Sequence, residues 1–247
     1  MKGSKIDLQK EKFEKMFNAG FSDYKIAKEL KMNHCSVFQY RKKHGYVRES
    51  LKENEIREIG NKEMNILLGT VLGDATLRKT HKNASYIVSH GPQQKAYCEH
   101  MAEALSSLGA KMRYSKRNAP DKRTGKLYES YICALPANPS LNYLYDLFYP
   151  DKTKIIPNDP FFKNHFNEIS LAYLYMDDGN KMQNGYAIAT MCFKEEEILE
   201  FRKLLFNKFN LETSMFADKR IYIKAKSKEH FKELISPYIH KTMMYKL

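Results

Sequence analysis

The sequence contains no tryptophan and only four cysteines among its 247 residues. Cys35, Cys98, Cys133 and Cys192 lie far apart along the chain, and no two of them form a C-x-x-C pair. This spacing argues against a zinc ribbon and against a disulfide framework, and it suits a reducing interior. The eight histidines show no H-x-x-x-H or H-E-x-x-H spacing, so no zinc site is expected.

Long hydrophobic runs are also missing. No stretch approaches the roughly 20 apolar residues of a membrane span, and the start MKGSKIDLQKEK lacks the apolar core of a signal peptide. We therefore expect an intracellular protein without a membrane partner, in the cytoplasm of a prokaryote or phage-infected cell, in an organelle or in a nucleus. At 43% apolar and 13% aromatic residues the chain can bury real cores, in one large domain or two smaller ones.

Acidic residues are few relative to basic ones. The chain has 42 Lys and Arg against 29 Asp and Glu, which gives a net charge of +13. A surplus of this size points to a polyanionic partner, with nucleic acid as the first candidate and mere solubility as the alternative. Most of the basic residues are lysines, which suit phosphate contact better than bidentate reading of bases.

Residues 1–46 have the pattern of three short helices. The first stops at residues 18–20, Ser22 or Asp23 caps the second, and Asn33 caps the third. Two short helices joined by a tight turn are typical of a helix-turn-helix unit, in which the third helix lies in the major groove. A plain three-helix bundle used for packing or partner binding is the alternative. The candidate DNA contacts in this unit are Ser36, Gln39, Tyr40, Arg41, Lys42 and Lys43.

Residues 47–63 are rich in charge and poor in apolar residues, which is typical of a solvated linker. From residue 64 onward a series of elements occurs twice, in halves that we place at 64–166 and 167–247. The first half predicts a helix at 66–72, a strand at 86–89, a helix at 93–108, strands at 111–116 and 127–135, and a helix at 141–148. The second predicts a helix capped by Ser170, a strand at 185–190, a helix at 195–209, a hairpin of 213–216 with 220–224, and a helix at 229–239. This order indicates a diverged tandem duplication.

The first helix of each half ends in aspartate. A carboxylate at a helix C-terminus is disfavoured by a few tenths to about 1 kcal/mol, unless a cation lies opposite. Two such ends brought together would form an oxygen-ligand site of the kind that Mg²⁺ prefers. Gly69 and Gly73 lie on one helix face and would allow a second helix to approach closely. Taken singly, each acidic end is more simply explained as an ordinary turn, but the recurrence at matching positions favours a site.

These helices carry a family resemblance. LLGTVLGDA (67–75) and LAYLYMDDG (171–179) resemble the two signature helices of a single-chain LAGLIDADG homing endonuclease. KIIPNDPFF (154–162) and LISPYIHKTMMYKL (234–247) are similar to the segments that accompany those helices in the family. The resemblance covers residues 64–247.

The resemblance implies an α+β fold of two αββαββα halves related by a pseudo-twofold axis, with saddle-shaped antiparallel sheets over DNA. Asp74 and Asp178 would bind Mg²⁺, which Mn²⁺ can replace, and help to activate water for hydrolysis of both strands. The implied activity is that of a monomeric, site-specific double-strand DNA endonuclease. The alternatives are an RNA-binding maturase, acting on intron RNA, and a DNA-binding regulator that does not cleave.

Further site residues follow from the same resemblance. Gly73 and Asp177 are candidate metal ligands next to the two aspartates, although Asp177 lies about 100° round the helix and is expected to point away. His90 matches the polar residue at the end of the first inner strand, and its counterpart in the second half is Met191, which cannot serve that role. Lys226, with Lys224 as the alternative, is the candidate basic catalytic residue.

The sheets that face DNA should carry alternating polar and basic residues. In the first half the candidates are Arg78, Lys79, Arg113, Lys116, Arg117, Lys122, Arg123 and Lys126. In the second half they are Lys181, Lys219, Arg220 and Lys224.

Overall fold

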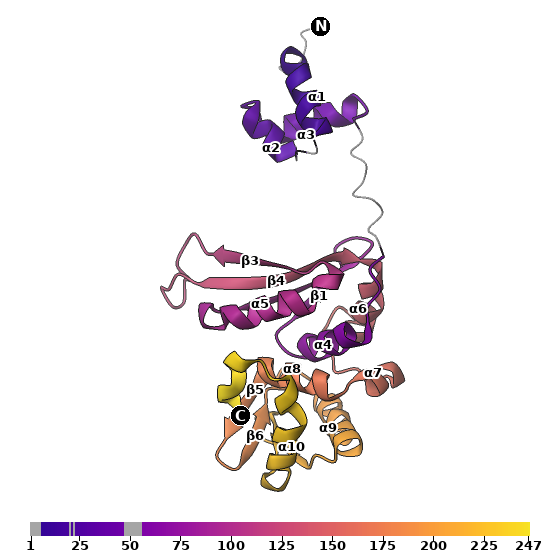
Figure 1. The fold of residues 1–247 in the computed structure, drawn as a ribbon, viewed down its shortest axis with the longest axis vertical. Helices are drawn as coiled ribbons and strands as arrows, with labels where there is room; N and C mark the ends of the chain where they lie inside the picture. The colour runs from indigo at the N-terminus through magenta and orange to yellow at the C-terminus, as the bar shows by residue number, and fades with distance from the viewer. Residues whose placement is uncertain (1–5, 20, 22, 47–55) are drawn as a thin grey trace. The chain divides into compact units, whose positions relative to one another are not determined.

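The computed structural model describes the whole chain except residues 1–5, 20, 22 and 47–55. The chain divides into two compact units, Met1–Glu55 and Ile56–Leu247, and each is described by itself. Figure 1 traces the elements of both units in chain order. Among the described residues, no helix is both long and apolar enough to cross a membrane.

The described residues of the first unit form a 3-10 turn and three helices. Its elements are η1 (Asp7–Gln9), α1 (Lys10–Asn18), α2 (Asp23–Glu29) and α3 (His34–Lys43). The helix α3 begins as expected, because the Asn33 side chain accepts a hydrogen bond from the backbone N–H of Cys35 at 2.8 Å. Phe13, Ile26 and Val37 are fully buried and form a core of the unit's own. The alternative cap of α2, Ser22, lies outside the described residues.

The first half of the second unit forms one four-stranded antiparallel sheet with helices. In chain order the elements are α4 (Asn61–Leu72), β1 (Thr76–Arg78), β2 (Ala84–His90), η2 (Pro92–Gln94), α5 (Lys95–Ala104), η3 (Ser106–Leu108), β3 (Lys111–Lys116), β4 (Glu129–Asn138), η4 (Pro139–Leu141) and α6 (Asn142–Phe148). The strand order is β1-β2-β4-β3.

The second half has the same design. It follows the helix α7 (Pro160–His165), and its elements are α8 (Glu168–Asp178), β5 (Gly179–Met182), β6 (Gly185–Ile188), α9 (Glu195–Phe209), β7 (Thr213–Met215), β8 (Ile221–Ile223), η5 (Ala225–Ser227), α10 (Lys228–Ile235), η6 (Ser236–Tyr238) and η7 (Lys241–Lys246). The strand order is β5-β6-β8-β7, which repeats that of the first sheet. The expected α+β fold with a duplicated half is therefore confirmed.

Several local expectations need correction. Residues 61–63, assigned above to the linker, form the first turn of α4. The cap of α8 is Asn167, whose side chain accepts from the N–H groups of Ile169 and Ser170, while Ser170 itself is a buried helical residue. The short strands β1 and β5 and the helix α7 were not expected from the sequence. Short elements like these offer too few residues for a periodic pattern.

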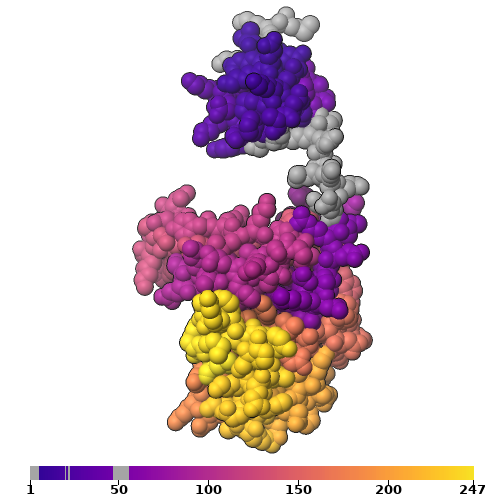
Figure 2. Space-filling view, in the orientation of Figure 1, coloured from indigo at the N-terminus to yellow at the C-terminus, as the bar shows by residue number. Residues whose placement is uncertain are grey.

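The helices α4 and α8 pack side by side at the centre of the second unit, where one hydrophobic core runs through both halves. In Figure 2 the two halves meet along a continuous surface. A Cβ atom on Gly69 would lie only 2.2 Å from the Ser170 carbonyl oxygen, and one on Gly73 would lie 2.6 Å from the Cβ of Asp177. The expected role of these two glycines, to let a second helix approach, is confirmed.

Candidate functional site

The C-terminal ends of α4 and α8 bring three carboxylates together. Asp177 and Asp178 are the last residues of α8, and Asp74 directly follows Gly73, the C-cap of α4. Asp74 is exposed, whereas Asp177 and Asp178 are half-buried. These carboxylates and the neighbouring His90 are called the acidic cluster below.

Asp177 points toward α4 rather than away from the site, so the expected direction of its side chain was wrong. Its Oδ2 accepts a hydrogen bond from the backbone N–H of Asp74 at 3.2 Å. Its Oδ1 accepts one from the Tyr97 hydroxyl at 3.0 Å. The close contact of the two helices at Gly73 determines this direction, because the Cβ of Asp177 fills the space that a larger residue than glycine would need.

His90 lies beside Asp74 in the buried part of the cluster. Its Nδ1 is 3.8 Å from Asp74 Oδ2, and its side chain is 1% exposed. One ligand atom from each of Asp74, His90 and Asp177 lies within 4.8 Å of the others, which is close enough for a shared cation. Burial lowers the pKa of His90, and the charge of Asp74 opposes that shift. The imidazole is therefore held mainly neutral, the form in which it can act as a ligand.

Two lysines sit beneath the carboxylates at equivalent places in the two halves. Lys154 donates hydrogen bonds to the carbonyl oxygens of Gly73 at 2.6 Å and Ala75 at 3.2 Å. Lys246 donates to the carbonyls of Met176 at 2.5 Å and Asp177 at 3.1 Å. Each ammonium group therefore caps the C-terminal end of one signature helix, where positive charge is stabilising.

The electrostatics of the cluster favour an additional cation. Burial, together with the charge of Asp74, raises the pKa of Asp178 from 3.8 to about 6. Burial and the same neighbour also raise the pKa of Asp177 well above its usual value. Burial lowers the pKa of both Lys154 and Lys246, and the three carboxylates oppose that shift. Like charges crowd together here, and a bound divalent cation would relieve their repulsion.

The lysines at the acidic cluster are not the ones expected to supply the basic catalytic residue. Lys226 lies in η5, where it forms an ion pair with Glu212, and Lys224 lies 3.8 Å from the same carboxylate. Both motifs that contain the true neighbours of the cluster, KIIPNDPFF and the C-terminal MMYKL, were noted as similar to family segments. The sequence does not predict the contacts of Lys154 and Lys246, because their partners lie 69 to 81 positions away and no local sequence pattern indicates such a hydrogen bond.

The Gly73 carbonyl, a candidate metal ligand above, accepts the short hydrogen bond from Lys154. Gly73 serves the site instead through its missing side chain, which admits Asp177. Asp74, Asp178, Asp177 and His90 remain the residues whose side chains can hold a cation.

The strand register also changes the counterpart of His90. Thr76 lies two residues after Asp74 and pairs with Ile87. Asn180 lies two residues after Asp178 and pairs with Ala187. Three residues beyond those partners stand His90 and Thr190, so the counterpart is Thr190 and not Met191. The Thr190 hydroxyl is buried and donates to the Lys219 carbonyl. The two halves of the site are therefore chemically unequal, since only the first has an imidazole.

Each sheet has one face covered by helices, and the other is called the open face below. In the first sheet Cys133 pairs with Val88 and Met112, and all three belong to the core beneath α5. Side chains one position further along each strand lie on the open face. Lys111, at the start of β3, is also on this face. The sequence does not predict it as a DNA contact, because the register of the strand decides which face its side chain lies on. The basic residues on this open face are Arg78, Lys111 and Arg113.

Other predicted DNA contacts have partners within the protein or lie on the covered side of a sheet. Lys116 lies opposite Glu129 on the helix-covered side and forms an ion pair with it at 2.8 Å. Lys79 lies 3.2 Å from Asp146 of α6. Lys181 stands opposite the buried Tyr186, which places it on the covered side of the second sheet.

The second sheet presents fewer basic side chains on its open face. Arg220 lies over the Phe216 ring and pairs with Asp218 at 2.8 Å. Lys219 occupies the turn before β8, with a φ of 69°. The open face itself carries polar and aromatic residues, among them Asn180, Ser214 and Tyr222.

In the first unit the structure separates the helix α3 into a buried and an exposed side. Tyr40 is 5% exposed, and its hydroxyl donates to Asp7 at 3.0 Å. Arg41 forms a hydrogen-bonded ion pair with Asp23 at 3.1 Å. Both therefore support the packing of the unit, contrary to their predicted role as DNA contacts. The exposed candidates on this helix are Ser36, Gln39, Lys42 and Lys43.

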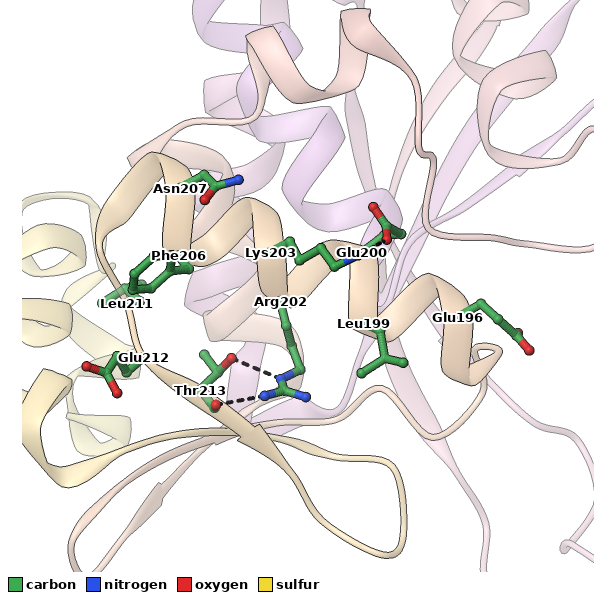
Figure 3. A pocket seen from close by; sticks show the side chains of 10 residues that line it. All are labelled: Glu196, Leu199, Glu200, Arg202, Lys203, Phe206, Asn207, Leu211, Glu212 and Thr213. Atoms are coloured by element: carbon green, nitrogen blue, oxygen red, sulfur yellow. Dashed lines mark hydrogen bonds and ion pairs between the residues drawn. The ribbon is translucent and has the colours of Figure 1, made fainter.

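A surface cavity of about 810 Å³ lies between α9 and the edge strand β7 (Figure 3). Arg202 crosses its floor and donates to the side chain and the carbonyl of Thr213 at 3.1 and 2.8 Å. Three glutamates line it, namely Glu196, Glu200 and Glu212. No residue of the acidic cluster lines this cavity, and its glutamates disfavour a nucleic acid, so it takes no part in the site.

Comparison with known proteins was made on sequence and on structure. A model of the LAGLIDADG DNA endonuclease family matches residues 64–234. The "Probable intron-encoded endonuclease 1" of Wickerhamomyces canadensis is 30% identical over 193 residues, which cover 73% of this chain and 81% of the relative. The "Cytochrome b mRNA maturase bI2" of Saccharomyces cerevisiae is 29% identical over 219 residues, covering 79% of this chain and 50% of that protein.

The structure is also similar to a solved one, that of the homing endonuclease I-WcaI bound to its DNA recognition sequence. The two match with a TM-score of 0.71 and 26% identity, over 84% of this chain and 97% of the other.

Proposed function

This chain belongs to the LAGLIDADG DNA endonuclease family, and from this membership and its acidic cluster we propose that it is a site-specific homing endonuclease that cuts both strands of DNA inside a cell. The observation that carries the proposal is the meeting of Asp74 with Asp177 and Asp178 at the ends of two packed helices. The comparison structure, with its bound DNA, supports duplex DNA as the substrate.

The donor set fits a divalent cation of the Mg²⁺ type, and Mn²⁺ fits as well. Carboxylate oxygens are ligands that suit both Mg²⁺ and Mn²⁺. Burial, and after it the charge of Asp74, raises the pKa of Asp178, and a bound divalent cation would favour the ionised carboxylate. When bound, such a cation lowers the pKa of water and stabilises charge on a phosphate.

The chain's own residues divide the remaining work. Asp74 and Asp178 would each hold cations for one strand, since each ends the signature helix of one half. Asp177 holds the backbone N–H of Asp74 and so orients that residue. Lys154 and Lys246, held at the helix ends by backbone carbonyls, would provide positive charge near the scissile phosphates. Because one chain supplies both halves of the site, a monomer suffices.

The basic open face of the first sheet and the exposed residues of α3 supply the contacts to DNA. Phosphate contacts by Arg78, Lys111 and Arg113 would position the duplex across the acidic cluster. Lys42 and Lys43 of the first unit would add affinity through counterion release. The proposal thus includes residues 1–46, which would act as a helix-turn-helix unit that binds DNA.

Cleavage of a randomised duplex library with Mg²⁺ tests the proposal. The wild-type chain should select and cut a defined site, and Asp74→Asn or Asp178→Asn should reduce the single-turnover rate by at least about a hundredfold. Each variant should still bind the selected duplex in Ca²⁺. Asp151→Asn, which alters an exposed acid in a turn, serves as the matched control and should cut normally.

Two outcomes would replace the proposal. Binding of duplex DNA without cleavage in Mg²⁺ or Mn²⁺ would identify a regulator on this fold. A preference for a folded intron RNA over duplex DNA would identify a maturase, the role named for the yeast relative.

A further inference from the structure

The loop 117–128, which joins β3 to β4, is organised by a single carboxylate. Asp121 Oδ1 accepts hydrogen bonds from the backbone N–H groups of Arg123 and Thr124, both at 3.1 Å, and from the Thr124 hydroxyl at 3.2 Å. Its Oδ2 accepts one from the guanidinium of Arg117 at 3.0 Å. One side chain therefore connects the beginning of the loop to its tip.

The backbone of the loop is closed as well. The N–H of Asp121 donates to the Lys126 carbonyl at 2.9 Å, and the N–H of Gly125 donates to the Asp121 carbonyl at 2.8 Å. Gly125 adopts a φ of 67°, which a glycine adopts without strain. The N–H of Arg117 donates to the Tyr128 carbonyl at 3.0 Å, which extends the ladder between β3 and β4. The loop is thus an ordered turn, closed by backbone hydrogen bonds, that continues the β3–β4 hairpin.

Loop 117–128 is positively charged. It contains four basic residues and one acid, so its net charge is 4 − 1 = +3. All four bases are exposed, whereas Asp121 is half-buried among its partners; the bases are Arg117, Lys122, Arg123 and Lys126. The loop belongs to the same pair of strands as Arg113 of the open face, and Figure 1 shows these two strands projecting beyond the rest of their sheet.

We propose that Asp121 is a positioning residue for DNA recognition, which holds loop 117–128 in the form that receives the duplex before the duplex arrives. The inference rests on the proposed function of this chain in binding DNA. Hydrogen bonds from Thr124 and Arg123 lower the pKa of Asp121, so the carboxylate is ionised and can keep all its partners at neutral pH. Ordering the loop and the Arg117 side chain in advance removes a cost that binding would otherwise bear.

The proposal predicts a change in DNA affinity opposite to the change that charge alone predicts. Removing an acid from a surface that faces a polyanion should strengthen binding, because repulsion is lost. If Asp121 positions the loop, its removal should weaken binding to the selected site even though the net charge becomes more positive. The two effects separate on an unrelated duplex, for which charge alone matters.

The test compares Asp121→Ala and Asp121→Asn with the wild-type full chain. The probes are the duplex that the wild type selects from a random library and an unrelated duplex of equal length, both in Ca²⁺. Asp121→Ala should weaken binding of the selected duplex about tenfold and leave the unrelated duplex unchanged or bound more tightly. Asp121→Asn should lie between, because its amide oxygen can accept from Arg123 and Thr124 while the ion pair with Arg117 is lost. Glu233→Gln, an exposed acid of α10, is the control and should not weaken either.

Two further readouts separate positioning from damage to the fold. The thermal midpoint and the single-turnover rate at saturating DNA should stay at wild-type values, and amide exchange at Arg123 and Thr124 in the free protein should become faster in Asp121→Ala. Selected-site binding as tight as or tighter than that of the wild type, or unchanged amide exchange, would overturn the inference while leaving the proposed function intact. A wild-type chain that selects no duplex from the library would overturn both.

Discussion

Single residues in the acidic cluster combine functional value with a cost in stability. Asp178 lies in a half-buried position near Asp74, so its ionisation opposes folding. The ionisation of Asp177 also opposes folding. The hydrogen bonds that it accepts from Asp74 and Tyr97 offset the effect of burial only in part. Active sites commonly carry such destabilising groups, because a site prepared for a cation is repulsive without it.

The pH dependence of stability should report this cost. The pKa of Asp178 is about 6 in the folded chain against 3.8 in the unfolded one, so the folded state binds the proton more readily. Stability is therefore lost as the pH rises from about 4 to about 6 and stays reduced above that. Without divalent cations, Asp178→Asn should raise the free energy of unfolding at pH 7.5 by roughly 1 to 3 kcal/mol, with little gain near pH 4.

Urea unfolding of wild type and variant in a chelator, at several pH values, measures this difference. Glu233→Gln provides the control, because it removes a charge from an exposed helix position. A variant no more stable than the wild type at pH 7.5 would show that Asp178 is not destabilised in the folded chain.

At the scale of elements, the helix pair α4 and α8 determines whether the site exists. The pair approaches closely at Gly69 and Gly73, and the acidic ends follow within one turn. Both glycines lie in or next to a helix that is buried along most of its length, from Asn65 onward. The distance between the two helices therefore also sets the distance between the carboxylates of the two halves.

Gly69→Ala tests this dependence. Alanine is intrinsically the better helix former by about 0.8–1 kcal/mol, so on propensity alone the variant should be more stable. The added Cβ would, however, lie 2.2 Å from a backbone oxygen of Ser170, and backbone yields little. We expect overpacking to prevail, with a net loss of roughly 1 to 3 kcal/mol and slower cleavage.

Thermal unfolding and the single-turnover rate measure the two effects of Gly69→Ala. The matched control is Gly91→Ala, because a Cβ at Gly91 meets nothing within 4 Å and its φ is negative. Gly69→Ala with wild-type stability and cleavage would mean that the helices can separate without harm to the site.

At the scale of the whole molecule, the chain combines two units with separate cores. The first unit has its own buried cluster around Phe13 and Val37, and the second has a continuous core through both halves. Residues of the acidic cluster and of both sheets belong to the second unit alone. The catalytic and the auxiliary DNA-binding functions that we propose are therefore separable.

A chain of residues 56–247 should fold and keep metal-dependent cleavage of the selected site. Its affinity for that site should fall, and the slope of log K against log salt should become shallower, because the basic residues of the first unit no longer release counterions. Circular dichroism, cleavage assays and salt titrations check these expectations against the full chain. Unchanged affinity and salt slope would mean that residues 1–55 do not contact DNA.

The sequence by itself determined the order of the longer elements, the duplication and the two acidic helix ends. Helical periodicity, caps such as Asn33 and breaks at Gly and Asp are local properties, so they can be read without coordinates. The two glycines of α4 were also predictable, because their spacing places them on one helix face. The resemblance of these helices to the LAGLIDADG signatures then implied the fold and the roles of the two principal carboxylates, Asp74 and Asp178.

Only the tertiary structure decided which side chains join those carboxylates. Asp177 turns inward, Lys154 and Lys246 cap the signature helices, and Thr190 rather than Met191 is the counterpart of His90 in the second half. Each of these facts depends on helix contact or strand register between residues tens of positions apart. A shift of one residue in register moves a side chain to the other face of a sheet, and no local pattern in the chain records that choice.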